Sequence, residues 1–200
     1  MKTKTLLGVS LAAAFVISMV GFAHAGGLSD YLSITGASAI DTTDGFQGTA
    51  TTEAKVPRSN LIENESNAIV GFGWVDLDTG EGFLAAIHPS FKDSTQNPRA
   101  WHTHPVSLSV WDFDAGQFCI EDLRSSQGGL ALNNNGVLVN VDTTNSENEF
   151  VGVTGSNADA VVSFVANVDT DCPVFSVNNQ NNPFGPAQVK VQVTDLESLP

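Results

Sequence analysis

Three histidines lie close together in this chain, at positions 88, 102 and 104. Within residues 100–112, AWHTHPVSLSVWD, His102 and His104 have the same parity and are followed on that parity by aliphatic residues. This is the period of a β-strand, so both imidazoles are predicted to lie on the side of the strand that faces the core. Neutral imidazole is a good ligand for Zn²⁺ and Cu²⁺, and the pattern therefore indicates a transition-metal site.

His88 joins this pair only if the strands on either side of residues 93–98 form a hairpin. That stretch, DSTQNP, consists of turn-forming residues. A hairpin centred near Thr95 would place His88 opposite His102, so that all three imidazoles share one face and converge on one ion, with a position left for water. The prediction depends on register, because a slip of one residue would turn His88 to the other face.

Ligating histidines usually donate their second ring nitrogen to a neighbouring acceptor that orients the ring. The acidic candidates for this role are Glu53, Asp93 and Glu121, and the sequence does not choose among them. The alternative interpretation is that the histidines are hydrogen-bonded strand residues, partly buried, that bind no metal.

The histidine pair is similar to the motifs of two families. His102-Thr103-His104-Pro105, followed by Ser109 and Asp112, resembles the H-x-H-P and S-x-x-D signature of the JAMM zinc proteases, but the proline and the serine are too close together and that family's helices are not indicated. The H-x-H pair also resembles the first cupin motif, whose glutamate and second motif are missing. We therefore assign no family.

A second set of candidate ligands is acidic and lies around Asp78-Thr79-Gly80. This tripeptide separates two apolar runs, and its Asp and Gly favour a tight hairpin turn. Asp76, Asp78 and Glu81 could also bind Ca²⁺ at the tip of that hairpin, although they match only the start of an EF-hand loop. Both the turn and the calcium site are therefore expectations for this segment.

Trp101 and Trp111 share a parity with several hydroxyl-bearing residues of the same stretch. Large flat rings beside hydroxyl groups are typical of a glycan-binding face, and we place a candidate glycan site there. The alternative is that these tryptophans fill the core, since aromatic side chains supply much of the buried area of a β protein.

The elements that must position these residues are strands. From residue 26 onward, apolar residues rarely occur at helical spacing, while Thr, Val, Phe, Ser, Gly and Asn dominate. We predict an all-β fold, an antiparallel β-sandwich or jelly roll of about ten short strands. The predicted strands are 31–37, 46–54, 68–77, 82–90, 100–111, 117–124, 136–142, 149–154, 160–168 and 187–195.

Residues 1–25 are predicted to be a signal peptide. Lys2 and Lys4 precede an apolar run, and Ala23-His24-Ala25 is a small-x-small cleavage site. Residues 26–200 are then a single secreted domain, extracellular, on the cell surface, or periplasmic where the host has a periplasm. No stable membrane insertion is expected after cleavage, because no second long apolar run follows.

Cys119 and Cys172 are the two cysteines of the chain. An even pair in an exported protein most often forms a disulfide, and we predict one here. The alternative is a pair of buried thiols.

The formal net charge of −14 restricts the partners of the protein. An acidic chain repels phosphate backbones and anionic headgroups, so binding to nucleic acid is disfavoured. Cations, polar glycans and basic proteins remain. The second functional hypothesis is therefore an extracellular structural, adhesive or glycan-binding module that self-associates or binds cell-surface glycans without catalytic activity. Whether the protein is an enzyme stays open, because no nucleophile beside a histidine and no phosphate loop is found.

Overall fold

The computed structural model describes residues 30–58, 69–88, 100–112, 115–124, 128–144, 152–178 and 186–200. The predicted signal peptide lies outside these residues. The described residues form twelve strands and no helix. Among them there is accordingly no helix long and apolar enough to cross a membrane. The strands are β1 (Ile34–Thr42), β2 (Gly45–Thr52), β3 (Ile69–Val75), β4 (Glu81–Ile87), β5 (His102–Asp112), β6 (Gln117–Arg124), β7 (Gly129–Asn133), β8 (Gly136–Asp142), β9 (Ala160–Val168), β10 (Phe175–Asn178), β11 (Pro186–Ala187) and β12 (Val189–Ser198).

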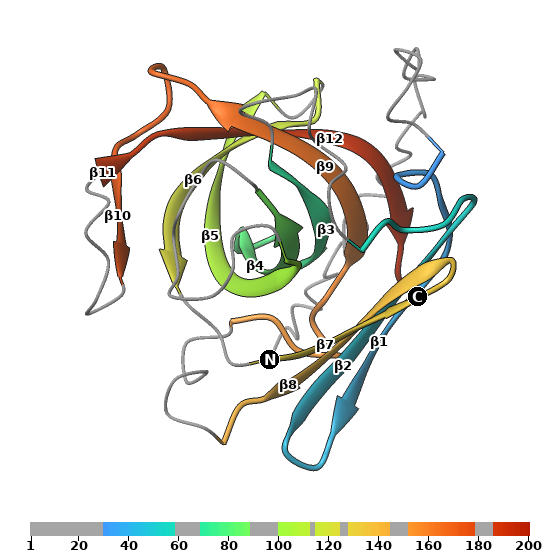
Figure 1. Ribbon diagram of the computed structural model, residues 1–200. Helices are drawn as coiled ribbons and strands as arrows, with labels where there is room; N and C mark the ends of the chain where they lie inside the picture. Colours follow the sequence, from blue (N-terminus) through green and yellow to red (C-terminus); the bar gives the residue numbers. More distant parts are fainter. Residues whose placement is uncertain are drawn as a thin grey trace, which may run out of the picture.

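Six strands close into a barrel. Their order is β6-β12-β9-β3-β4-β5, and pairing between β5 and β6 closes the ring. Every neighbouring pair in the ring is antiparallel. Figure 1 looks down the barrel and shows the second sheet, of order β1-β2-β8-β7, against its outside. β10 extends the barrel sheet by pairing parallel to β6, and β11 pairs antiparallel with β10.

The all-β, antiparallel prediction is confirmed, whereas the predicted sandwich or jelly roll is not. The difference lies in β5, which pairs with β4 through His102–Ser107 and with β6 through Val106–Asp112. Register shifts between Ser107 and Leu108 and between Val110 and Asp112 interrupt the pairing with β6. Such irregularities bend a strand, which lets one long strand close a sheet that would otherwise stay open.

Most predicted strands occur close to their expected bounds. The hairpin with Asp78-Thr79-Gly80 at its turn is present between β3 and β4, and Gly80 has a φ of 77°, which favours glycine. Residues 152–154, the described part of the predicted strand 149–154, form no strand. β7, β10 and β11 were not predicted. They are two to five residues long, which leaves few positions in which alternation can be detected.

The apolar residues divide into cores outside and inside the barrel. The outer core lies between the four-stranded sheet and the outward faces of the barrel strands, where the ring of Phe46 on β2 meets that of Phe83 on β4 edge to face at 5.6 Å. The inner core consists mainly of aliphatic residues from β4, β5, β6, β9 and β12, with Phe164 among them. Alternation along β3 and β4 directs neighbouring side chains to different cores.

The barrel interior is narrow, and small residues make room for its larger side chains. A Cβ atom at Gly71 would lie 2.4 Å from the carbonyl oxygen of Ala85 and 2.6 Å from Cζ of Phe164. We expect Gly71→Ala to lower the free energy of unfolding by about 1–3 kcal/mol, because backbone and ring must both shift. Urea unfolding measures this change.

The matched control is Gly129→Ala on β7. A Cβ there would meet its nearest neighbour, Asn140, at an ordinary 3.7 Å. This variant is expected to change the free energy of unfolding by less than about 1 kcal/mol. Equal losses in both variants would contradict the tight fit inferred for the barrel interior.

The predicted disulfide is confirmed. Cys119 of β6 is bonded to Cys172, which lies in the connection between β9 and β10, and their Cα atoms are 5.5 Å apart. Cys119 alternates along β6 with Ile120 of the inner core, so the bridge lies on the outside of the barrel. A disulfide is consistent with an extracellular location, because such bonds persist in oxidising compartments.

Candidate metal centre

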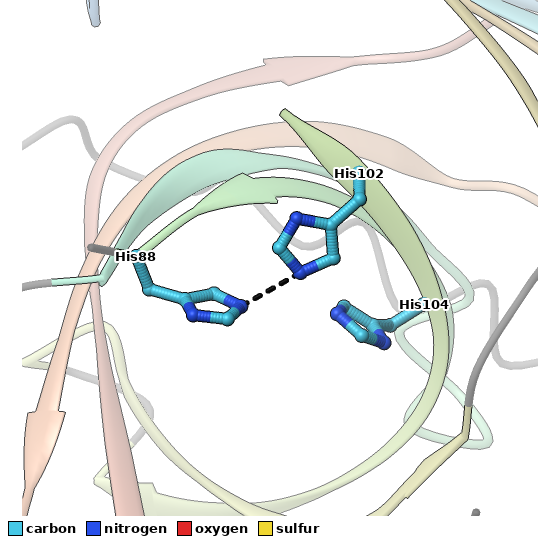
Figure 2. Close-up of side chains that lie close together, drawn as sticks. All are labelled: His88, His102 and His104. Atoms are coloured by element: carbon cyan, nitrogen blue, oxygen red, sulfur yellow. Dashed lines mark hydrogen bonds between the residues drawn. The ribbon is translucent and has the colours of Figure 1, made fainter. Parts of the chain in front are cut away.

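The three histidines converge inside one end of the barrel. His88 directly follows β4, His102 is the first residue of β5, and His104 is the third. His88 has the same parity as Leu84 and Ala86 of β4, which both belong to the inner core. Its side chain therefore points into the barrel. Figure 2 shows the three rings directed toward a common centre from the two strands.

The ring nitrogens are close enough to share one ion. One nitrogen from each of His88, His102 and His104 lies within 4.8 Å of the others. Nε2 of His88 and Nε2 of His102 are 2.7 Å apart. The ring centroid of His102 is 4.5 Å from that of His88 and 4.7 Å from that of His104. The cluster could therefore hold a metal ion.

The register differs from the predicted one by two residues. Ala86 lies opposite His102 and Leu84 opposite His104, whereas the predicted hairpin had His88 opposite His102. A shift of two residues keeps every side chain on its face, while a shift of one would have reversed it. His88 consequently lies diagonal to His102, and the three imidazoles still share the barrel interior.

Backbone carbonyl groups fix the orientation of two of the rings. Nδ1 of His102 donates a hydrogen bond to the carbonyl oxygen of Ala100, and Nδ1 of His104 donates to that of Arg124, each over 2.9 Å. A carbonyl oxygen can only accept, so Nδ1 carries the proton in both rings. In the neutral imidazole the lone pair then lies on Nε2, as is usual for metal-binding histidines held by an outer acceptor.

The predicted acidic orienters are not confirmed. Glu53 and Glu121 are exposed, and Asp93 lies outside the described residues. The acceptors found, the carbonyl groups of Ala100 and Arg124, were missed because any residue can supply a backbone carbonyl. Only the fold shows that the end of β6 reaches His104, and residue type carries no signal of it.

The site is buried in apolar surroundings. The exposed fractions of His88, His102 and His104 are 2%, 6% and 2%. A cavity of about 20 Å³ adjoins the rings of His88 and His104. The other described residues that line it are Ile69, Leu84, Ala86, Ile120, Leu123, Phe164, Ala166 and Val189. Burying three imidazoles among such side chains costs free energy unless their polar atoms find partners.

Two of the candidate calcium ligands accept hydrogen bonds from nearby protein groups. Oδ1 of Asp76 accepts hydrogen bonds from the backbone amides of Asp78 and Thr79, each over 3.0 Å. Oε1 of Glu81 accepts one from the Ser107 hydroxyl over 2.9 Å. Asp76, Asp78 and Glu81 form no group of three within metal-ligating reach, and within the described ranges only the histidines do so. Asp76 therefore caps the turn, and the calcium site stays a prediction.

Trp101 belongs to the outer core. It is 7% exposed, stacks on Phe72 with ring centroids 6.0 Å apart, and donates from Nε1 to the carbonyl oxygen of Pro57 over 2.8 Å. This burial corrects the expectation that Trp101 presents an open face to a glycan. The side chain of Trp111 lies outside the described part of the structure.

No protein-family model, no curated protein and no solved structure matches this chain.

Proposed function

We propose that this protein is secreted and binds one transition-metal ion, zinc or copper, through Nε2 of His88, His102 and His104. The observation that carries the proposal is the convergence of three buried imidazoles. Two of them also have their Nδ1 protons committed to carbonyl groups. Three histidine ligands with one position left open is an arrangement that zinc and copper both accept.

The contact between His88 and His102 also supports the proposal. Their Nε2 atoms are 2.7 Å apart, and because His102 donates through Nδ1, the Nε2 proton between the two rings belongs to His88 when both are neutral. Metal binding would require the proton of His88 to lie on Nδ1 instead, so that the lone pairs of both Nε2 atoms would be available to the ion. Coordination would thereby offset the cost of burying the rings.

The choice between zinc and copper depends on the type of ligand and on which metal is available to the protein. Neutral imidazole suits both ions, and within the described cluster no thiolate or thioether joins the histidines to favour Cu⁺. Cys119 and Cys172 are consumed by their disulfide. Copper is expected to bind more tightly than zinc, in line with the general order of affinities for divalent ions, so metal supply decides the occupant.

The experiment that tests the proposal is metal analysis of the protein purified without chelator, followed by thermal unfolding with and without added metal. We expect about one equivalent of zinc or copper per chain. At a free zinc concentration 100 times the Kd, the free energy of unfolding should rise by about 2.7 kcal/mol. For a chain of this size that corresponds to a rise in Tm of roughly 5–10 °C.

A chelator should reverse the rise in Tm. Calcium serves as the control ion, because it prefers oxygen ligands and should leave Tm unchanged. Absence of bound metal after incubation with zinc and with copper, together with an unchanged Tm, would overturn the proposal.

A further inference from the structure

The small cavity beside the histidines limits what else could reach a bound metal. Its volume is about 20 Å³, slightly more than the roughly 10–15 Å³ that a single water requires. It adjoins the rings of His88 and His104 and extends among apolar side chains of the inner core. A group bound there could add only a few atoms to those already in the metal's coordination sphere.

The charge of the site determines which small group is favoured. The three ligands would be neutral imidazoles, so a divalent ion would keep its full charge of +2. The described residues that line the cavity include no carboxylate, thiol or thioether that could lower this charge. Uncompensated charge in an apolar interior is costly, and an anion in the remaining coordination position would halve it.

From size and charge together, we infer that the remaining coordination position binds a small monoanion of one to three atoms, such as hydroxide, chloride or azide, and excludes larger anions. The inference rests on the proposed metal site and deepens it by assigning the class of its exogenous ligand. An open coordination position on the surface of a protein would admit anions of any size, whereas the described residues beside this one are packed side chains of the inner core.

The test uses the purified protein loaded with Co²⁺, whose visible absorption reports changes in its coordination. Azide is the small probe, and benzoate, with the same charge and a larger volume, is the size control. We expect azide to change the spectrum with saturable binding, and benzoate to bind at least about ten-fold more weakly.

Two cavity-filling variants sharpen the test. Ala166 lines the cavity from β9, and Ala166→Val should raise the Kd for azide by at least about ten-fold while the protein still binds one Co²⁺. The matched control is Val165→Ile, because Val165 lies on the outward face of the same strand and contacts the outer core. If Ala166→Val fails to fold, Val189→Leu fills the same cavity from β12.

The possible failures are distinguishable. Absence of Co²⁺ binding would refute the metal site itself, and the inference with it. Cobalt binding without any spectral response to azide would refute the open position alone. Equal binding of azide and benzoate, or an unchanged Kd for azide in the folded cavity-filling variants, would show that the cavity does not select the ligand.

Discussion

His104→Ala is expected to lower the affinity for zinc by more than about 100-fold, because loss of an outer partner of a ligating histidine already costs 10–100-fold. The His102→Ala, His104→Ala double variant should retain no stoichiometric metal. The reason is geometric, since His88 alone would then remain beside a cavity whose other described lining residues are apolar. Isothermal titration with zinc, supported by metal analysis, measures both effects.

The control for this prediction lies one residue away on the same strand. Thr103 is buried but points outward, with the parity opposite to that of His102 and His104. Thr103→Val should therefore bind about one equivalent of zinc with the affinity of the unmodified protein. Retention of full affinity in His104→Ala would mean that the metal, if bound, is held elsewhere.

His104→Ala also leaves a space in the barrel, and a variant that fails to fold would lose metal for the wrong reason. His104→Leu replaces most of the ring volume with an aliphatic side chain that suits the inner core. We expect this variant to remain folded in urea titrations and to show the same loss of zinc affinity. A folded His104→Leu protein that binds zinc normally would contradict the proposed ligand set.

Removal of the disulfide is expected to produce the largest loss of stability. Cys119 and Cys172 are 53 residues apart in the sequence, and closing a loop of that length contributes about 4 kcal/mol in the chain-entropy model. Cys119→Ala, Cys172→Ala should lower the free energy of unfolding by about this amount. Urea unfolding under non-reducing conditions measures the loss.

Hydrogen bonds should keep the connection between β9 and β10 in place in this double variant. The amide of Cys172 donates to the carbonyl oxygen of Asp169 over 3.2 Å, and Nε2 of Gln188 donates to the carbonyl oxygen of Cys172 over 2.8 Å. Because the bridge lies outside the barrel and the histidines inside, the folded variant should still bind about one equivalent of metal. Dithiothreitol should destabilise the unmodified protein and leave the variant unchanged. Equal stability of the unmodified protein with and without reductant would contradict the prediction.

The local pattern of the sequence determined a large part of this protein. Alternation in residues 100–112 predicted a strand with His102 and His104 on its core-facing side, and Asp78-Thr79-Gly80 predicted the turn between β3 and β4. Pairing of the two cysteines was also predictable, because there is only one way to pair two residues. Each of these features depends on residue type or on the alternation of apolar and polar residues over a short range, and both can be read directly from the sequence.

Other features depended on contacts between residues far apart in the chain. Closure of the barrel requires β5 to pair with β6 as well as with β4. The sequence of β5 or of β6 taken alone does not indicate this second pairing. The carbonyl group of Arg124 reaches His104 from β6, twenty residues away, and the burial of Trp101 follows from the outer core. Local alternation predicts which residues of a strand share a face, but it does not predict which strands lie side by side.

The position of His88 depends both on the local sequence pattern and on contacts between distant strands. The predicted register was displaced by two residues from the one found, yet His88 still joined His102 and His104, because the side-chain period of a strand is two and an even shift preserves the face. Parity, which the sequence determines, therefore brought the three imidazoles to the same side. The distances between their nitrogens and the cavity beside them were decided by the tertiary structure, since both depend on how six strands close around a common interior.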